Sequence, residues 1–508
     1  MITYQYNLAS RILNLLHVSS NNIALCFIDR EYSFSELCTL SIDWVIRLER
    51  YGLQSQDYIG IKSDKSVDSY SLLIACNILG VAYAHLDNNS PKQREIYILE
   101  TLKPSLIIDY YAKRIYSLSN EIDDTFDTTP TVSPLIDLDH TKQFIQKYKD
   151  RVTGDATAYV MFTSGSTGQP KGVAISQFSI MNFTDWVKET YKITKDDRFS
   201  GVNQIYFDNS IFDFYGSVYN SASLIPIDGD ILRYPKKTID ILDQLKATIW
   251  FSVPSFLIFC MRMKSLTSGR MSFLRCIIFG GEGFPKSNFI KLYELLGTTI
   301  DYYNVYGPTE GTCICSSHKI SDQDLVDTKN LAPLGKIASN FGYTITEQDE
   351  NGVGELILTG PQISKGYLNK PTLTNERFGF QSNRGLFEKS YKTGDLVQEI
   401  NNVIFFRGRV DNQIKHMGYR IELEEIESYF YESNLFIECA ATYTIDDAIA
   451  GSICMHLVTR DVRPLPENVI KSVCLKIPNY MTPRRFIYYR SLPKNSNGKI
   501  DRKNLHEK

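Results

Sequence analysis

Short apolar runs that recur between helical patterns constrain the fold of this chain more than any other feature. Continuous runs such as ATIWFSV (247–253) and LRCIIFG (274–280) are typical of strands, and each is followed by a helical or turn segment. Residues 1–150 alternate in the same way, with YIGIK at 58–62 and SLIIDYY at 105–111. Apolar strands that alternate with helices indicate parallel sheets covered on both faces. We therefore expect an α/β fold.

The pattern changes after about residue 330, where short strands and Gly/Asn turns follow one another, as in NGVGELILTGPQ at 351–362. The last hundred residues predict a compact α+β unit, with the strands ECAATYT and GSICMHLV and a helix near 467–476. A chain of 508 residues is also too long for one core. We expect a large N-terminal domain of parallel-rich sheets flanked by helices, a distorted β subdomain, and a small C-terminal domain.

Charge and cysteine content exclude several classes of function. The chain has 55 Lys+Arg against 58 Asp+Glu, so a net charge of −3 provides no field that would attract nucleic acid or an anionic membrane. Its 10 cysteines form no CxxC pair or Cys/His cluster, which argues against a structural zinc site and a secreted disulfide framework. The chain has no signal-like N-terminus and no window near the roughly 18 apolar residues of a membrane span. We expect a cytoplasmic protein.

The stretch YVMFTSGSTGQPKGVAIS (159–176) places six small residues, Thr163 to Gly168, between two short strands, followed by Lys171. Consecutive backbone N–H groups with hydroxyls and an ammonium nearby can form a cradle for phosphate oxygens. The stretch differs from the G-x-x-x-x-G-K-[ST] loop, because Pro170 stands at the second glycine and a strand follows. On composition alone, a flexible surface loop is the better interpretation.

Four further motifs change that interpretation. They are NVYGPTEGT (304–312), YKTGDLV (391–397), FFRGRVDNQIKHMGYRIELEEIE (405–427) and LPKNSNGKIDR (492–502). Each is weak alone, but all five in this order resemble the adenylate-forming superfamily, which includes amino-acid adenylation domains of nonribosomal peptide synthetases, acyl-CoA ligases and luciferases. The stretches TIWFSVPSF, GGEGFP and ISKGYLNKP are most similar to stand-alone amino-acid adenylation enzymes, in particular D-alanyl carrier-protein ligases.

The resemblance implies that a carboxylate attacks the α-phosphorus of ATP, giving an acyl-adenylate and pyrophosphate, and that a thiol then takes the acyl group. Thr309 would contact the α-phosphate, Glu310 would hold Mg²⁺, and Lys499 would be the essential cation between the carboxylate and the α-phosphate. Asn304 and Tyr306 would bind the adenine. Asp395 would bind the ribose hydroxyls with the help of Arg409. The residues that the resemblance assigns to ATP are Thr163, Ser164, Gly165, Ser166, Thr167, Gly168, Lys171, Asn304, Val305, Tyr306, Gly307, Pro308, Thr309, Asp395, Phe406, Arg409 and Lys499.

The family carries out its second step by rotating a mobile C-terminal domain. By resemblance, the domains are residues 1–410 and 411–508, Asp411 is the hinge, and the face from Lys415 to Gly418 admits the thiol arm. The chain ends nine residues after Lys499 without a carrier segment. We therefore expect the protein to load a separate carrier protein bearing phosphopantetheine. We also expect a monomer.

Asp208 carries the prediction of the substrate class, since it matches the acid that pairs with the α-ammonium in amino-acid-activating members. The remaining pocket lining carried over by position is Asn209, Phe212, Phe251, Ile278, Gly280, Val305, Cys313 and Ile314. This lining has no charge, so we expect a small to medium apolar amino or imino acid, with proline a candidate. Gly280 stands where D-alanine activators carry cysteine, and we expect its missing side chain to leave a void. Gln177 replaces a usual histidine near the pocket floor.

Two alternatives remain. An acyl- or aryl-CoA ligase has the same fold, and Asp208 argues against it. A catalytically inactive nucleotide-binding or scaffold protein is the other, and Thr163, Glu310, Asp395 and Lys499 argue against that.

Overall fold

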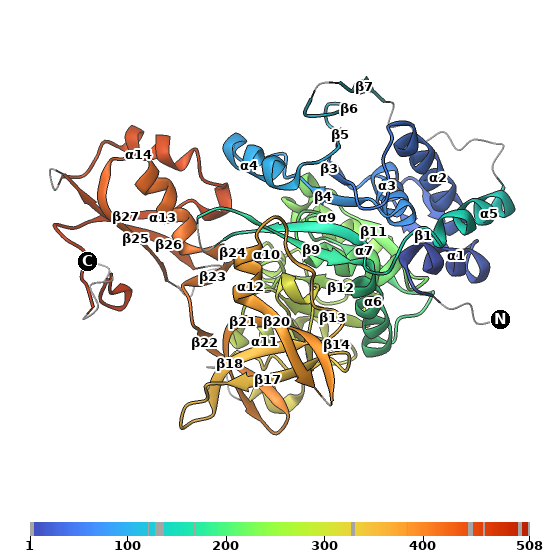
Figure 1. Ribbon diagram of the computed structural model, residues 1–508. Helices are drawn as coiled ribbons and strands as arrows, with labels where there is room; N and C mark the ends of the chain where they lie inside the picture. Colours follow the sequence, from blue (N-terminus) through green and yellow to red (C-terminus); the bar gives the residue numbers. More distant parts are fainter. Residues whose placement is uncertain are drawn as a thin grey trace. The chain divides into compact units, whose positions relative to one another are not determined.

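The computed structural model describes residues 5–119, 121–126, 137–165, 168–326, 331–383, 385–444, 451–460, 463–495 and 500–505. The chain divides into two compact units. The first comprises Met1–Leu86, Thr101–Met161 and Gly172–Gly408, and the second comprises Asp87–Glu100, Phe162–Lys171 and Arg409–Lys508. The small-residue loop at 162–171 thus belongs to the same unit as the C-terminal residues, an assignment that the sequence did not predict. The α/β fold class is confirmed (Figure 1).

A mixed sheet of the first unit has the strand order β16-β15-β14-β13-β12-β10-β11-β1-β2. Neighbours from β14 to β1 are parallel, and the strands at both edges are antiparallel. The predicted apolar runs form its central strands, since the side chains of a strand covered on both faces are all buried. The bounds are β1 Ile23–Cys26, β2 Glu31–Ser33, β10 Arg198–Gly201, β11 Ser223–Pro226, β12 Ile249–Ser252, β13 Cys276–Gly280, β14 Asp301–Tyr306, β15 Ser316–Lys319 and β16 Lys336–Ile337.

Another mixed sheet has the order β19-β9-β8-β4-β3-β5-β6-β7. Its strands β8, β4, β3 and β5 are parallel neighbours, and the loop at 162–171 joins β8 to β9. The bounds are β3 Tyr58–Lys62, β4 Ala82–His85, β5 Leu106–Asp109, β6 Arg114–Tyr116, β7 Asp123–Thr125, β8 Thr157–Thr163, β9 Lys171–Ser176 and β19 Gly366–Tyr367.

The expected β subdomain is an antiparallel sheet of order β17-β18-β21-β20, with β22 paired to β21. A register shift between Glu355 and Ile357 distorts the pairing of β18 with β21. The bounds are β17 Gly342–Thr346, β18 Val353–Thr359, β20 Phe378–Asn383, β21 Leu386–Ile400 and β22 Val403–Arg409.

Apolar faces and capped ends specify the helices of the first unit. Helix α2 begins with a capping box, in which the Ser33 hydroxyl accepts from the backbone N–H of Glu36 and the Glu36 carboxylate accepts from that of Ser33. The bounds are α1 Leu8–Val18, α2 Phe34–Arg50, α3 Val67–Leu79, α5 Leu138–Lys149, α6 Gln177–Tyr191, α7 Asn209–Val218, α8 Gly229–Leu232, α9 Pro235–Gln244, α10 Pro254–Arg262, α11 Lys286–Leu296 and α12 Pro371–Arg377. Within the described residues, no helix has the length and apolar content needed to cross a membrane.

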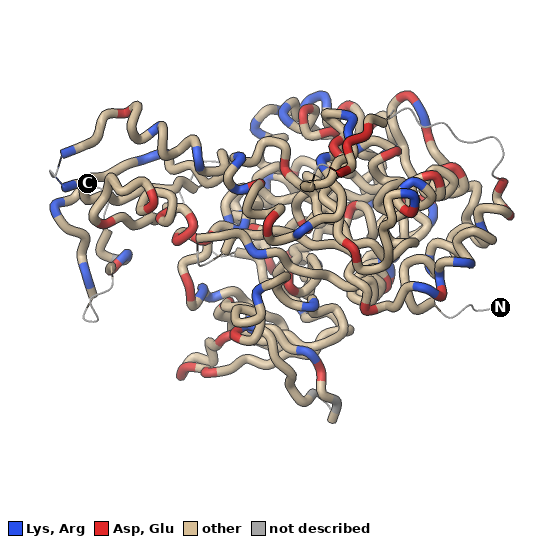
Figure 2. The backbone as a smooth tube through the Cα atoms, turned by 45° about the horizontal axis from the view of Figure 1, so that its top comes forward, with Lys and Arg blue, Asp and Glu red and all other residues tan. Residues whose placement is uncertain are grey.

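The second unit has its own core, to which Ile421, Phe430 and Met455 contribute fully buried side chains. Strands β23 (Gln413–His416) and β24 (Tyr419–Glu422) form a hairpin. Helix α13 packs against strand β25 of the sheet β25-β26-β27. The other bounds are α4 Lys92–Leu102, α13 Leu423–Glu432, β25 Phe436–Thr444, β26 Ser452–Thr459, α14 Glu467–Cys474 and β27 Arg485–Tyr488. Basic and acidic residues are interspersed along both units (Figure 2).

Candidate active site

The small-residue loop is held in a tight turn between β8 and β9. The N–H of Gly168 donates to the carbonyl oxygen of Gly165 over 3.0 Å, and Gly168 has a φ of +80°. A Cβ on Gly165 would lie 2.1 Å from the carbonyl oxygen of Gln169, so that position accepts only glycine. Ser166 and Thr167 lie outside the described residues.

Polar groups around this turn fit a loop that binds anionic oxygens. The Thr163 hydroxyl is buried without a hydrogen-bond partner among the described residues, which is costly unless a ligand satisfies it. Gly165 N–H donates to the buried carboxylate of Glu425 over 3.2 Å, and Glu425 also pairs with Arg94 in the same unit. The Ser164 hydroxyl donates to the carbonyl of Arg420, and Lys171 is buried at the start of β9. The loop thus already presents an amide to a carboxylate oxygen.

Asp208 and Thr309 meet in the first unit, although 101 residues separate them. The Thr309 hydroxyl donates to the Asp208 carboxylate over 2.6 Å. Thr309 is buried at the start of a 3-10 turn, Thr309–Gly311, that follows the Gly307-Pro308 segment. Asp208 is half-buried directly before α7, and its side chain makes no capping bond to that helix. The residues predicted for the amino-acid ammonium and for the α-phosphate are therefore neighbours.

The neighbouring Glu310 is completely buried and hydrogen-bonded. The hydroxyl of Tyr367 donates to its carboxylate over 2.7 Å, and the N–H of Ser364 donates to its backbone carbonyl over 2.8 Å. Among the described residues, no group of three or more His, Cys, Asp or Glu side chains could hold a metal ion. A cation at Glu310 would therefore need phosphate oxygens or water as further ligands.

The residues predicted for the nucleoside come together from β14 and β21. The hydroxyl of Tyr306 donates to the buried carboxylate of Asp395 over 2.5 Å. Asn304 is also buried, and its side-chain N–H₂ donates to the carbonyl oxygen of Pro333 over 2.7 Å. Phe406 is partly exposed on β22.

The predicted pocket lining is brought together by adjacent strands and α7. Phe251, Ile278 and Val305 lie on β12, β13 and β14, and the Phe212 and Phe251 ring centroids are 4.8 Å apart. Cys313 and Ile314 are buried after the Thr309 turn. Burial raises the pKa of the Cys313 thiol well above its ordinary value, so the side chain stays a neutral thiol.

The void expected at Gly280 is absent, and that prediction is wrong. A Cβ on Gly280 would lie 2.5 Å from the carbonyl oxygen of Val305 and 2.6 Å from its Cγ2 atom. The two residues are direct partners in the pairing of β13 with β14, so the backbone and side chain of Val305 fill the space. Gly280 permits a close approach of two strands, and its missing side chain leaves no void that a larger substrate group would fill.

Gln177 also has a role that its sequence position did not predict. Its fully buried side-chain amide accepts from the N–H of Leu8 and donates to the carbonyl of Asn77, each over 2.9 Å. These bonds join the starts of α1 and α6 to α3. Packing of the helices therefore accounts for this glutamine without reference to a pocket floor.

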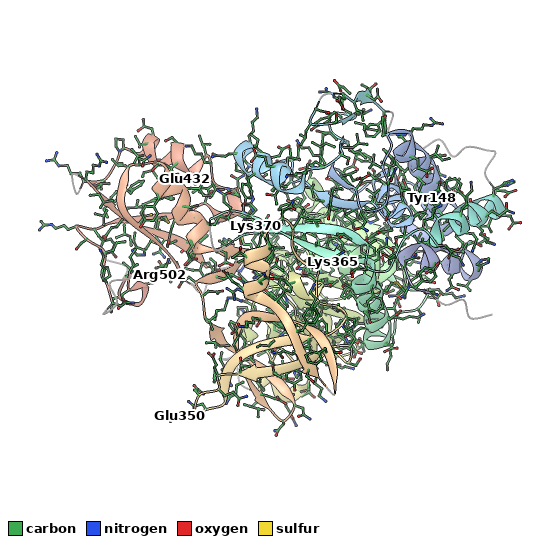
Figure 3. All side chains as sticks on the ribbon, in the orientation of Figure 1. Tyr148, Glu350, Lys365, Lys370, Glu432 and Arg502 are labelled. Carbon is green, nitrogen blue, oxygen red and sulfur yellow. The ribbon has the colours of Figure 1, made fainter. Side chains whose placement is uncertain are left out.

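The hinge and thiol-arm residues lie in the second unit. The guanidinium of Arg409 makes two hydrogen bonds to the Asp411 carboxylate, of 2.5 Å and 2.8 Å. Lys415 lies on β23, and Gly418 forms the hairpin turn together with Met417. Lys499 lies outside the described residues. Arg502 (labelled in Figure 3), three positions later, donates to Glu427 over 2.7 Å. The roles of these residues stay predictions.

Gln362 is a buried residue that the sequence analysis missed. Its side-chain N–H₂ lies within 2.9 Å of the carbonyl oxygen of Gly311, 3.1 Å of that of Thr312 and 2.8 Å of that of Ile314. Thr312 and Cys313 have φ values of +58° and +70°, which residues other than glycine rarely adopt. Gln362 therefore holds the strained segment that links Thr309 to the pocket lining. No local pattern around Gln362 signals this role.

A buried network of charged and amide side chains, Lys65, Asp213 and Asn203, was missed as well. The Lys65 ammonium donates to the carbonyl of Gly201 over 2.6 Å, and burial lowers its pKa to about 8. Asp213 accepts two bonds from the Asn203 side chain, and burial raises its pKa, which the nearby charge of Lys65 opposes. Asn203 also donates to the carbonyl of Phe251 over 3.0 Å, so the network supports one wall of the pocket lining. The sequence signal for this network was the single acid, Asp213, in the largely apolar helix α7.

The fold and this arrangement of residues define an adenylate-forming ligase. The chain belongs to the family of AMP-binding enzymes, whose family model matches residues 16–368. It is 31% identical over 453 residues to the D-alanine–D-alanyl carrier protein ligase of Bacillus cytotoxicus, covering 85% of each chain. The ligase of the same name from Bacillus licheniformis is 34% identical over 366 residues, with coverage of 70% of this chain and 72% of the relative.

Solved structures support the fold. The Vibrio cholerae adenylation domain AlmE, in complex with glycyl-adenosine-5′-phosphate, superposes with a TM-score of 0.81 at 22% identity, covering 98% of this chain and 97% of that one. A nonribosomal peptide synthetase protein that contains adenylation and PCP domains superposes with a TM-score of 0.80 at 20% identity, covering 99% of this chain and 84% of that one. At these identities the likeness concerns the fold alone.

Proposed function

We propose that the protein uses ATP to activate a small to medium apolar amino or imino acid as its aminoacyl-AMP. It then transfers the aminoacyl group to the phosphopantetheine thiol of a separate carrier protein. Glycine, alanine of either hand, proline and valine are the candidate substrates. The relatives named D-alanine–D-alanyl carrier protein ligase support both the small side chain and the carrier protein.

The observation that carries this proposal is the 2.6 Å hydrogen bond between Thr309 and Asp208. A carboxylate that binds the ammonium of an amino acid must lie close to the group that binds the α-phosphate, because the substrate carboxylate and the phosphorus react with each other. In the free protein, the hydroxyl of Thr309 satisfies Asp208. A substrate ammonium would take over that carboxylate and release the hydroxyl to donate to a phosphate oxygen.

The apolar lining explains why a small apolar side chain is proposed. Phe212, Phe251 and Ile278 are buried, and a charged substrate side chain among them would lack a partner. The filled space at Gly280 removes the argument for a larger group, so alanine and glycine rank equally with proline and valine.

Charge neutralisation would come from several groups of the chain. The 162–171 loop would bind the β- and γ-phosphates through its amides, the Thr163 hydroxyl and Lys171. Glu310 would hold Mg²⁺, which when bound offsets phosphate charge. Lys499 would act as the cation between the attacking carboxylate and the α-phosphate. For the thiol step, the residues after Asp411 would rotate, replacing Lys499 by the Lys415–Gly418 face.

Amino-acid-dependent exchange of labelled pyrophosphate into ATP tests the proposal. The panel comprises glycine, L- and D-alanine, L- and D-proline, L- and D-valine, acetate, benzoate and a medium-chain fatty acid. We expect exchange with one or more of the amino acids and none with the three simple carboxylic acids. Exchange with a simple acid alone would support an acyl- or aryl-CoA ligase, and ATP binding without any exchange would support an inactive nucleotide-binding protein.

A further inference from the structure

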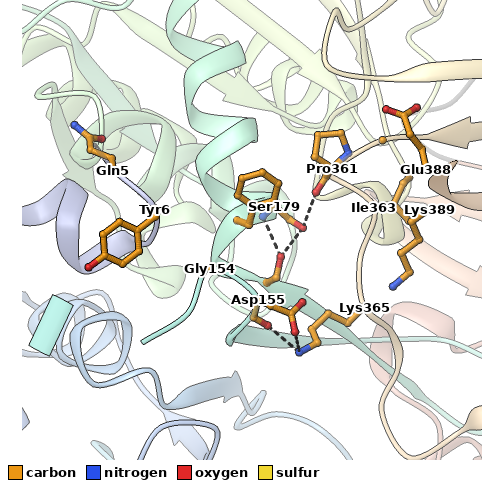
Figure 4. A pocket seen from close by; sticks show the side chains of 13 residues that line it. Gln5, Tyr6, Gly154, Asp155, Ser179, Pro361, Ile363, Lys365, Glu388 and Lys389 are labelled. Atoms are coloured by element: carbon orange, nitrogen blue, oxygen red, sulfur yellow. Dashed lines mark hydrogen bonds and ion pairs between the residues drawn. The ribbon is translucent and has the colours of Figure 1, made fainter. Parts of the chain in front are cut away.

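A cavity of about 660 Å³ lies in the first unit among residues to which no role in adenylation is assigned. Segments far apart in the sequence form its walls: the N-terminal residues, the loop before β8, the start of α6, the loop after β18, and β21 (Figure 4). Its lining is Gln5, Tyr6, Gly154, Asp155, Ser176, Phe178, Ser179, Gly360, Pro361, Ile363, Lys365, Glu388 and Lys389. None of these residues belongs to the predicted ATP or amino-acid sites.

Two lysine side chains extend into this cavity. Lys365 donates to the backbone carbonyl of Asp155 over 2.8 Å and to its carboxylate over 3.1 Å (Figure 4). In the described part of the chain, Lys389 has no carboxylate within ion-pair distance, and its ammonium lies over the Phe378 ring, 5.6 Å from the ring centroid. Among the described residues, the cavity therefore holds one ammonium with a carboxylate partner and one without.

Among the described residues, the neighbouring acids Glu388 and Asp155 form no ion pair with Lys389, and the charge of Asp155 offsets the effect of burial only in part. Glu388 extends away from Lys389 (Figure 4) and accepts from the Thr359 hydroxyl over 3.2 Å. Burial lowers the pKa of Lys389 to about 8, the Asp155 charge opposes this decrease, and the Lys365 charge adds to it. Tyr6, on the opposite wall, is neutral, because burial and its bond to Asp150 raise its pKa to about 12. An anion in the cavity would relieve the repulsion between the two lysines.

The cavity also has aromatic and apolar side chains in its lining, which favour a ligand whose remaining part is uncharged. The side chain of Phe178 is 47% exposed, and Tyr6 and Ile363 also line the cavity. The start of the 15-residue helix α6 adds positive potential. The hydroxyls of Ser176 and Ser179 there already bond to each other, and the Ser179 hydroxyl donates to the carbonyl of Pro361. An acidic group at the lysines would thus lie beside aromatic and apolar surface.

We propose that this cavity is a second ligand site, which binds a small organic anion through the ammonium groups of Lys365 and Lys389. Its ligand carries a carboxylate or a phosphate group, the two chemistries that a pair of ammonium groups recognises. Binding requires protonated Lys389, so the affinity falls about tenfold for each pH unit above the pKa of that lysine.

Nuclear magnetic resonance of the protein with ¹³C-dimethylated lysines tests the site directly. The Lys389 signal is assigned by its loss in Lys389→Arg and followed through a pH titration in sodium chloride. The titration is repeated at equal ionic strength with acetate, benzoate or inorganic phosphate. We expect at least one probe to raise the pKa of Lys389 saturably, with benzoate stronger than acetate if the apolar wall takes part. An effect of phosphate alone would assign the ligand to the phosphate class.

Matched variants separate this site from phosphate binding elsewhere. Lys389→Met and Lys365→Met should each weaken probe binding, measured as a thermal shift, at least tenfold. Lys392→Met, on the same strand with its side chain exposed, should leave it unchanged. A Lys389 titration that is identical in chloride and in all three probes would overturn the proposal, and this measurement needs no variant beyond the assignment. Equal probe binding by Lys389→Met and the wild type would also overturn it.

Discussion

The Thr309 hydroxyl donates a 2.6 Å hydrogen bond to the carboxylate of Asp208 across 101 positions of the sequence. Thr309 begins the turn after β14, while Asp208 precedes α7, so two separate elements of the first unit supply the pair. Each group can bind one end of the reacting centre, the hydroxyl a phosphate oxygen and the carboxylate an ammonium. Their contact makes the proposed adenylation chemistry spatially consistent.

Replacing Asp208 by Asn should raise the KM for the amino acid about a hundredfold and leave the KM for ATP nearly unchanged. The substrate ammonium would lose its charged partner in a partly buried site, a loss of about 3 kcal/mol. Steady-state pyrophosphate exchange measures both constants. Asp230→Asn, an exposed acid in α8, is the control. An unchanged KM for the amino acid would favour the acyl-CoA ligase alternative.

Lys499→Ala should nearly abolish amino-acid-dependent pyrophosphate exchange, because positive charge is needed while the carboxylate attacks the α-phosphorus. Thiol transfer from preformed aminoacyl-adenylate should remain largely intact. Lys471→Ala removes an exposed lysine of the same unit and should change neither activity. Near wild-type exchange by the Lys499 variant would show that another cation carries the first step.

Gln362→Glu should reduce kcat for exchange at least tenfold while the protein stays folded. The substitution keeps the shape of the side chain but places a carboxylate against the carbonyl oxygens of Gly311, Thr312 and Ile314. Circular dichroism and thermal unfolding establish the fold, and the exposed Gln323→Glu is the control. If the folded Gln362 variant keeps full activity, the geometry of the 309–314 segment does not depend on this amide.

Gly280→Cys should destabilise the protein by about 1–3 kcal/mol, because its Cβ would meet the carbonyl oxygen of Val305. We expect a lower Tm and similar losses of kcat/KM for every accepted amino acid, without a specific gain for alanine. Thermal unfolding and the ratio of kcat/KM values for two substrates test this. A stable variant with a shifted preference would restore the pocket-void interpretation.

Much of the fold follows from local sequence properties. Apolar runs at 58–62, 247–253 and 274–280 correspond to β3, β12 and β13, since a strand buried on both faces must be apolar along its length. The motifs around Thr163, Thr309 and Asp395 likewise identified the superfamily, because phosphate and ribose contacts require particular residue types next to turns. Neither kind of signal depends on knowing the distant neighbours of a residue.

The sequence by itself determined the α/β class, the order of the motifs and the superfamily. Only the tertiary structure decided that Thr309 meets Asp208, that Gln362 holds the 311–314 carbonyls, and that Val305 fills the space beside Gly280. It also buried Lys65 where the charge of Asp213 influences its pKa, and it left Lys389 without a carboxylate at ion-pair distance among the described residues. The physical reason is that local periodicity specifies which face of an element is buried. The atoms that meet across that face depend on strand register and helix placement, which the whole chain decides together.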